Sequence, residues 1–307
     1  MDDKIPCRIL TGPTASGKSD FGLHLAEENG WAIACMDSMQ IYRGLDIGTA
    51  KPSADDQRRV RHFLLDICEP EDSFSVSEYR EKAENLITDL WEKSRQEVLF
   101  VGGTGLYMQA LIHPMDMGRV AADPERRISL QKITEEPDGK RKLHDLLEKL
   151  DPKTARRLPV NDIRRVIRAI EVTEKTGIPF SEQPQRENEQ RFDWRIASTS
   201  LNRDALYDRI NRRVGKMIHA GLADEVRTLL ARGVPEKSQC MSGIGYKEMI
   251  PYLRGECQLD EAAENIRLNT RHYAKRQITF LKREAEIQYV DASDPQAECK
   301  LRRILLG

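Results

Sequence analysis

The sequence has few cysteines, and none of them is arranged as in a metal site or a disulfide framework. The six cysteines among 307 residues stand at positions 7, 35, 68, 240, 257 and 299, so no two form a Cys-x-x-C pair. Zinc knuckles and disulfide-rich secreted folds both need paired cysteines, and both are disfavoured here. We expect all six to be reduced and to serve as small buried apolar side chains.

Long hydrophobic runs are absent as well. The mean hydropathy is -0.60, and no apolar stretch approaches the ~18 to 20 residues of a membrane-spanning helix. The chain begins MDDKIP, without the basic start and apolar stretch of a secretory signal. We therefore expect a soluble protein in the cytoplasm, with no membrane partner.

The sequence also lacks low-complexity segments and a large net charge. Glycine and proline number only 19 and 14, and 39% of residues are hydrophobic, which disfavours collagen-like and disordered chains. The 49 basic residues nearly cancel the 50 acidic ones, so overall charge alone does not indicate a nucleic-acid partner. Locally the charges separate, because residues 264–283 hold six basic residues and one acidic residue.

Short apolar runs alternate with helix-like stretches in the first third of the chain. Each run has the character of a buried parallel strand and is followed by a turn and a stretch of helical periodicity. These runs are residues 9–10, 32–36, 63–67 and 98–101. The alternation predicts an α/β fold with a doubly wound parallel sheet. Residues 194–201 are expected to return to this sheet as a fifth strand, and residues 286–290 to add a short terminal one.

Only helical signals occur between residue 117 and about residue 180. Asp151 followed by Pro152 predicts one helix start, Asn161-Asp162 predicts another, and Gly177 predicts a helix end. A polar stretch over residues 181–193 is typical of a linker. We therefore predict a core of residues 1–116 and 194–307, interrupted by a helical insertion domain of residues 117–193.

The most specific motif directly follows the first predicted strand. The segment Gly12-Pro13-Thr14-Ala15-Ser16-Gly17-Lys18-Ser19 fits the phosphate-loop pattern G-x-x-x-x-G-K-[ST] at every fixed position. In such a loop, backbone N–H groups and a helix N-terminus surround a diphosphate, and the lysine neutralises its oxygens. Ser19 is then a candidate ligand for Mg²⁺. The motif predicts a P-loop NTPase-like sheet and a diphosphate ligand, but it does not specify a nucleoside.

Two further segments are expected at the same edge of the sheet. Asp37 comes directly after the second strand, where it either caps the following turn or accepts a proton or binds Mg²⁺ through water. Gly102-Gly103-Thr104-Gly105 follows the fourth strand and permits close backbone approach. Many kinases carry an acidic residue at that strand end. Asp66 is the one residue here that resembles it, so a P-loop kinase using ATP is an alternative.

Three basic clusters suggest a second, extended anionic ligand. Charge runs are usually solvated surfaces, but three of them beside a phosphate loop favour a nucleic acid. The clusters are Arg164, Arg165 and Arg168; Arg209, Arg212 and Arg213; and Arg267, Arg271, Lys275 and Lys282. Tyr246 and Phe280 either stack on an exposed base or pack in the core. An RNA-binding module without enzymatic activity is a third alternative.

Blocks of sequence from Gly12 to Phe280 resemble, in order, the tRNA dimethylallyltransferases. The blocks are GPTASGKS, DSMQIYRGLDIGTAKP, VGGTGLY, RRVIRAIEV, LYDRINRRV, GIGYKE and TRHYAKRQITF. The resemblance implies transfer of a dimethylallyl group from dimethylallyl diphosphate to the exocyclic N6 amine of the adenosine next to the anticodon of tRNA, on its 3′ side. It also implies Mg²⁺ as cofactor and the tRNA anticodon arm as partner. No obligate protein partner is expected.

The resemblance also implies roles for individual residues. Asp37 corresponds to the general base, and Thr14 and Arg213 to contacts with the diphosphate. The implied tRNA contacts lie around the target base, on the insertion and on two later segments. They are Asp37, Ser38, Met39, Gln40, Thr104, Arg164, Arg165, Val166, Ile167, Arg168, Ser242, Gly243, Ile244, Gly245, Tyr246, Lys247, Lys275, Arg276, Gln277, Ile278, Thr279, Phe280, Leu281 and Lys282.

Overall fold

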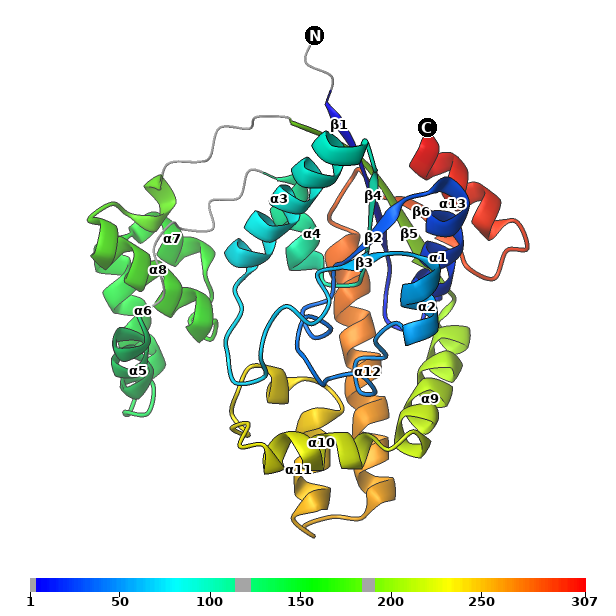
Figure 1. Cartoon of the computed structure of the whole chain (residues 1–307). Coiled ribbons are helices and arrows are strands. Elements are labelled where there is room, and N and C mark those ends of the chain that lie inside the picture. Colours follow the sequence, from blue (N-terminus) through cyan, green and yellow to red (C-terminus); the bar gives the residue numbers. More distant parts are fainter. Residues whose placement is uncertain (1–3, 114–122, 184–190) are drawn as a thin grey trace. The chain divides into compact units, whose positions relative to one another are not determined.

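A sheet of six parallel strands runs through the part of the chain that the computed structural model describes, which is residues 4–113, 123–183 and 191–307 (Figure 1). The strands lie in the order β3-β2-β4-β1-β5-β6, and each neighbouring pair is parallel. The strands are β1 (Ile5–Thr11), β2 (Ala32–Cys35), β3 (His62–Phe63), β4 (Val98–Val101), β5 (Phe192–Ser200) and β6 (Gln288–Asp291). The predicted α/β class with a parallel sheet is confirmed.

The third strand differs from its prediction over residues 63–67. Leu64 and Asp66 have φ angles of 59° and 53°, in the left-handed region, which is incompatible with a strand. Strand β3 is therefore only two residues long. The other expected strands are present, with ends shifted by one or two residues in most cases.

Helices cover both faces of the sheet. Ile9 and Leu10 are neighbours in β1 and point to opposite faces, and each belongs to a different hydrophobic cluster. The cluster around Leu10 includes side chains of α1 and α13, and the one around Ile9 includes side chains of α3, α4 and α9 to α12. The helices are α1 (Lys18–Asn29), α2 (Ala54–Arg59), α3 (Val76–Ser94), α4 (Gly105–Ile112), α9 (Arg203–His219), α10 (Leu222–Ala231), α11 (Tyr246–Leu253), α12 (Leu259–Leu281) and α13 (Ala297–Leu306).

The chain divides into two compact units, residues 1–113 with 189–307 and residues 114–188. Our expected borders at 117 and 193 differ from these by a few residues. The second unit holds α5 (Pro124–Ile133), α6 (Gly139–Leu150), α7 (Pro152–Arg157) and α8 (Ile163–Thr176), which share a core of their own. The predicted signals act as expected: Asp151 accepts a hydrogen bond from the Thr154 N–H and caps α7, and Gly177, with φ 69°, ends α8.

A buried ion-pair network lies inside the second unit. The fully buried Glu171 carboxylate accepts hydrogen bonds from Arg127, at 2.9 Å from each of two guanidinium nitrogens, and from Arg168 at 2.5 Å. Although burial opposes the charge, these bonds and the Asp123 N–H hold the pKa of Glu171 at about 2. The small helical unit thus contains a buried carboxylate whose charge is stabilised by two arginines and one backbone N–H group.

The cysteine expectation is only partly correct. Cys7, Cys35, Cys68 and Cys240 are buried and free, but Cys257 is half-buried and Cys299 is exposed. Within the three described ranges, no helix combines the length and the apolar character that crossing a membrane requires.

Candidate active site

The carboxyl ends of β1, β2 and β4 meet at one edge of the sheet because these neighbouring strands are parallel. This edge carries the phosphate loop after β1, Asp37 after β2 and the glycine-rich turn after β4. Gly102 allows the close approach: a Cβ there would lie 2.0 Å from the carbonyl oxygen of Met36. Thr104 then reaches across, because its Oγ1 accepts a hydrogen bond from the Ser38 N–H at 3.0 Å.

Strand β5 supports the phosphate loop from one side. The Oγ atoms of Ser16 and Thr199 are 2.6 Å apart and share a hydrogen bond. Gly12 has a φ of 144°, and a Cβ there would lie 2.3 Å from Thr199 Oγ1. Gly17 has a φ of 92° and precedes the first residue of α1. Both positions therefore require glycine, and the loop curls so that the N-terminus of α1 faces its concave side.

Gln277, on α12, supports the loop from the other side. Its Oε1 accepts a hydrogen bond from the Thr14 N–H, and its Nε2 donates to the Gly103 carbonyl oxygen, both at 2.8 Å. The side chain is buried. Gln277 is expected from the family resemblance among the tRNA contacts, but both ends of its amide connect the phosphate loop to the turn after β4. No local pattern distinguishes this role.

Two cations converge on the loop. Lys18 Nζ donates to the Pro13 carbonyl oxygen at 3.3 Å, and Arg213 Nη2, from α9, donates to that of Thr49 at 3.0 Å. Desolvation, and next the nearby charge of Arg213, lower the pKa of Lys18 to about 8, while Asp37 opposes the shift. Within the described part of the chain, neither cation forms an ion pair with a carboxylate. A bound anion would therefore relieve their repulsion.

Arg209 adds a third contact from α9. Its Nη1 donates to the Ser16 carbonyl oxygen at 3.4 Å, whereas Arg212, in the same cluster, is exposed. Arg209 and Arg213 are four residues apart and lie on one face of the helix. That spacing is the signal that separates these two arginines from Arg212.

Asp37 forms a turn and also faces the cations. Its Oδ1 accepts a hydrogen bond from the Met39 N–H at 2.9 Å, so Asp37 does cap the turn that follows β2. Its Oδ2 has no hydrogen bond from any described residue. Desolvation lowers the pKa values of both Lys18 and Arg213, and the negative charge of Asp37 opposes that lowering in each. The carboxylate thus lies beside the anion site with one oxygen open to a ligand.

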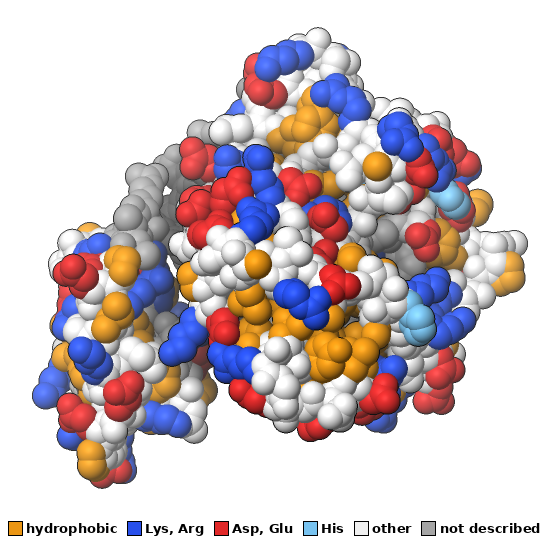
Figure 2. Space-filling view, turned by 60° about the horizontal axis from the view of Figure 1, so that its bottom comes forward, with side chains coloured by type: hydrophobic (Ala, Val, Ile, Leu, Met, Phe, Trp, Pro, Cys, Tyr) orange, Lys and Arg blue, Asp and Glu red, His pale blue; other side chains and the backbone are white. Residues whose placement is uncertain are grey.

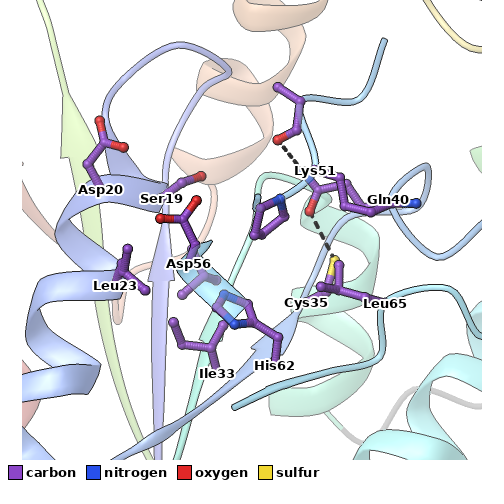
Figure 3. A pocket seen from close by; sticks show the side chains of 13 residues that line it. Ser19, Asp20, Leu23, Ile33, Cys35, Gln40, Lys51, Asp56, His62 and Leu65 are labelled. Atoms are coloured by element: carbon purple, nitrogen blue, oxygen red, sulfur yellow. Dashed lines mark hydrogen bonds between the residues drawn. The ribbon is translucent and has the colours of Figure 1, made fainter. Parts of the chain in front are cut away.

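A pocket of about 160 Å³ opens beside Ser19 (Figure 3). Its lining includes the polar side chains of Ser19, Asp20, Gln40 and Asp56, together with apolar ones from α1 and β2. Gln40 Oε1 accepts a hydrogen bond from Cys35 Sγ at 3.4 Å, and Nε2 donates to the carbonyl oxygens of residues 49 and 50 at 3.1 and 3.2 Å. These bonds hold Gln40 between the end of β2 and residues 49 and 50.

Asp66 is not placed like the acidic residue of a kinase. It follows the shortened β3 with a positive φ and accepts a hydrogen bond from Lys51 Nζ at 2.6 Å. Lys51 also donates to Asp46 Oδ1 and to the Tyr42 carbonyl oxygen. Asp66 therefore fixes a loop.

The basic stripe on α12 divides into two parts. Arg267 pairs with Glu264 at 3.0 Å, and Arg271 donates to Asn211 at 2.8 Å. Lys275, Arg276 and Lys282 are exposed. Among the described residues no carboxylate pairs with these three, so they can bind an extended anion without first breaking an ion pair, whereas Arg267 and Arg271 both lie near Glu264.

Several other implied tRNA contacts have buried side chains. Val166 and Ile167 lie in the core of the second unit, which leaves Arg164 and Arg165 as the exposed members of that segment. Leu281 is also buried, as are Gly243 and Gly245. Met39, Ile244 and Ile278 are half-buried, whereas Thr279, Ser242 and Lys247 are exposed.

Both aromatic candidates pack against glycines. The ring of Tyr246 is buried, and its atoms would lie 2.6 Å from a Cβ at Gly48. The half-buried ring of Phe280 would lie 2.3 Å from a Cβ at Gly105, the first residue of α4. Tyr246 is therefore packed in the core, and Phe280 packs over the first residue of α4.

Relatives of known name match nearly the whole chain. The tRNA dimethylallyltransferase of Halalkalibacterium halodurans is 42% identical over 297 residues, covering 96% of this chain and 94% of the relative. That of Pelotomaculum thermopropionicum is 44% identical over 288 residues, covering 94% and 91%.

Solved structures agree in fold. The full-length tRNA isopentenylpyrophosphate transferase from Bacillus halodurans has a TM-score of 0.72 at 39% identity and covers 99% of this chain and 95% of its own. A eukaryotic dimethylallyltransferase, captured acting on tRNA, has a TM-score of 0.79 at 25% identity and covers 97% and 77%. A family model described as IPP transferase matches residues 40–284. By both sequence and fold, the chain belongs to the IPP transferase family.

Proposed function

We propose that this protein is a tRNA dimethylallyltransferase. It transfers the dimethylallyl group of dimethylallyl diphosphate to the N6 amine of the adenosine 3′-adjacent to the anticodon. One observation carries the proposal: Lys18 and Arg213 converge on the phosphate loop without carboxylate partners among the described residues, and Asp37 lies beside them with one oxygen open. This arrangement suits a diphosphate leaving group next to a proton acceptor.

The loop and the cations act on the leaving group. Negative charge develops on the diphosphate as the allylic carbon–oxygen bond breaks, and preorganised donors stabilise that charge best. Lys18, Arg213 and the N–H groups at the start of α1 supply positive charge from three sides. Thr14 and the other residues of the loop, Gly12 to Ser19, surround the same anion.

Asp37 acts on the acceptor. The adenine amine is a weak nucleophile because its lone pair is delocalised into the ring. A carboxylate that takes its proton as the new bond forms typically contributes ~10²- to 10⁴-fold. The target nucleotide has to leave the anticodon stack to reach this site. Ser38 follows Asp37 in the chain and hydrogen-bonds to Thr104, so both side chains are proposed to hold the target nucleotide, together with Gln40 from the same segment.

Mg²⁺ fits this site only together with the diphosphate. Among the described residues, no group of three or more His, Cys, Asp or Glu side chains is arranged to hold a metal. The hydroxyl of Ser19 is exposed at the start of α1 and would share the ion with diphosphate oxygens. The ion would neutralise part of the leaving-group charge.

The tRNA anticodon arm is the proposed extended anion. Phosphate contacts from lysine and arginine position nucleic acids. The exposed cations proposed for such contacts are Arg164, Arg165, Lys247, Lys275, Arg276 and Lys282. Two of them also form ion pairs, Arg165 with Asp162 at 3.5 Å and Lys247 with Glu248 at 3.6 Å. The six free cysteines agree with a reducing compartment, so we place the reaction in the cytoplasm.

Radiolabelled prenyl transfer to unmodified tRNA, with the product nucleoside mapped, tests the proposal. We expect label at the adenosine 3′ of the anticodon, and Asp37→Asn is expected to lower the rate at least a hundredfold. Asp260→Asn, at an exposed position in the first turn of α12, is the matched control and should keep the wild-type rate. Wild-type protein that binds ATP but not the thio-analogue of dimethylallyl diphosphate would instead support a kinase.

A further inference from the structure

Glu225, on α10, binds the backbone of a turn that precedes Thr49. Its Oε2 accepts hydrogen bonds from the N–H groups of Asp46 and Ile47 at 2.9 and 2.7 Å, and its Oε1 accepts from the Gly48 N–H at 3.0 Å. The hydroxyl of Tyr246 also donates to Oε1, at 2.7 Å. The carboxylate therefore has four donors, two on each oxygen, and its hydrogen-bonding capacity is used entirely within the protein.

The carbonyl oxygen of Thr49 joins this turn to the active site. It accepts a hydrogen bond from Arg213 Nη2 at 3.0 Å and another from Gln40 Nε2 at 3.1 Å. Arg213 is the proposed diphosphate contact, and Gln40 follows Asp37 in the segment proposed to surround the target base. One backbone oxygen thus fixes Arg213, proposed to contact the prenyl diphosphate, and Gln40, proposed to lie near the target base, relative to each other.

Contacts on both sides of Glu225 leave this turn little freedom. Lys51 Nζ pairs with Asp46, the first residue of the turn, and with Asp66, each at 2.6 Å. The ring of Tyr246 lies against Gly48, where a Cβ would be 2.6 Å from it. Between these contacts, the turn's N–H groups rest on the Glu225 carboxylate, so the position of Thr49 depends on Glu225.

We propose that Glu225 is a positioning residue for the transfer reaction: it orients residues 46–48 so that the Thr49 carbonyl holds Arg213 and Gln40 in place. This inference rests on the proposed function and adds a residue to it. Glu225 itself touches neither the reacting atoms nor the loop. Its loss should weaken the grip on the donor and leave the tRNA contacts on α12 unchanged.

Glu225→Gln tests the inference with little change in size. The amide keeps one oxygen, but its nitrogen turns toward N–H groups that need an acceptor. We expect the dissociation constant of the dimethylallyl diphosphate thio-analogue, measured by calorimetry, and the donor KM to rise roughly tenfold. The tRNA KM should stay within about twofold, because Gln40 is only one of many proposed tRNA contacts. An unchanged donor affinity, or an equal rise in both KM values, would overturn the inference.

Asp224→Asn is the matched control. Asp224 is the preceding residue of the same helix, is exposed, and pairs with Arg227 rather than with the turn. Donor affinity should match wild type. Tyr246→Phe is the milder second variant, which keeps the ring against Gly48 and removes one donor to Glu225. It should weaken donor binding by roughly two- to fourfold, and no change in this variant would count against the inference.

A double-mutant cycle distinguishes positioning from a general loss of structure. If Glu225 acts through Arg213, Glu225→Gln should change donor affinity less than about twofold in an Arg213→Ala background. A further tenfold loss there would overturn the inference. The wild-type assay separates this result from the parent proposal: absence of prenyl transfer in wild type rejects the function, whereas transfer with an unaffected Glu225→Gln rejects only the role of Glu225.

Discussion

The edge of the parallel sheet and the helical second unit place their charged groups in opposite ways. At the sheet edge, Lys18 and Arg213 form no ion pair with a carboxylate in residues 4–113, 123–183 or 191–307, and side chains from distant segments hold the backbone around them. In the second unit, buried Glu171 is paired with two arginines, and Arg164 and Arg165 point outward. The space-filling view shows basic and acidic side chains interspersed on the face turned to the reader (Figure 2).

This difference separates two physical tasks. Stabilising a leaving group requires charges held in place before the reaction, and each must keep its charge available. Positioning a polyanion requires only accessible cations on a stable support. We therefore interpret Glu171 as a structural charge, and we propose that Lys18 and Arg213 are kept for a ligand.

Gly12→Ala should give the largest effect at the sheet edge. The new Cβ would lie 2.3 Å from Thr199 Oγ1 at a φ of 144°, so the loop would have to move away from β5. We expect binding of the donor thio-analogue to fall more than a hundredfold in calorimetry. Gly30→Ala is the control for a positive φ without a clash, because its φ of 69° lies in the left-handed α region, which costs alanine less, and nothing lies within 4 Å of the new Cβ. Equal affinities in both variants would contradict the role given to the loop.

Glu171→Gln should affect the other region alone. Removing the charge leaves Arg127 and Arg168 facing a neutral amide, which costs ~3 kcal/mol in typical buried pairs. All three tryptophans, at 31, 91 and 194, lie in the first unit, so helical circular dichroism should lose stability to urea while tryptophan fluorescence does not. Glu174→Gln breaks the partly exposed pair with Arg126 and should cost less than ~1 kcal/mol.

The same residue predicts how the second unit responds to acid. The pKa of Glu171 is lowered to about 2 by its arginines and hydrogen bonds. A lowered pKa contributes stability that is fully present above the unfolded value, ~4.3, and is lost as the pH falls through the folded value. The helical signal of wild type should therefore fade between about pH 4 and pH 2, and Glu171→Gln should remove that part of the pH dependence.

Lys18, at the sheet edge, loses its charge as the pH rises, whereas Glu171 loses its charge as the pH falls. Desolvation and Arg213 lower its pKa to about 8, so the free enzyme loses this positive charge as the pH rises through that value. Donor affinity should be nearly constant around neutral pH and weaken by up to about tenfold per unit above pH 8. Lys18→Met should bind weakly with no such step. A wild-type affinity that is flat to about pH 10 would show that Lys18 does not contact the anion.

Lys275→Ala is expected to have the smallest effect. One lost phosphate contact should weaken tRNA binding by a few-fold and reduce the salt slope by about one, without changing donor affinity. Lys300→Ala, which removes an exposed lysine paired with Asp294 on the far segment of the chain, should leave the slope unchanged. Identical slopes for both variants would mean that the α12 stripe is an ordinary solvated surface.

Local patterns predicted the parts of the fold that short stretches of chain determine. The phosphate loop, the parallel sheet, the Asp151 cap and the Gly177 helix end all follow from a few consecutive residues. The shortened β3 did not, because an apolar run does not reveal the left-handed backbone at Leu64 and Asp66.

Hydrogen bonds between residues far apart in the sequence, which hold the site in shape, could not be predicted in the same way. Gln277 meets Thr14 across 263 positions, and Glu225 meets Ile47 across 178. A side chain that binds a backbone group leaves no periodicity and no motif in its own neighbourhood. Sequence patterns therefore missed Glu225 as a support of this edge of the sheet, and they predicted a different role for Gln277.

The amide of Gln277 also limits how this protein can be engineered. Helix α12 carries outward-facing cations on one side and, within one turn of them, a side chain that spans two backbone groups at 2.8 Å each. Exchanging the outward residues changes only what the helix presents to RNA. A redesign that rotates or slides the helix by about one ångström would take both bonds beyond their usual range. Altered RNA preference should therefore be sought by surface exchange at a fixed helical register.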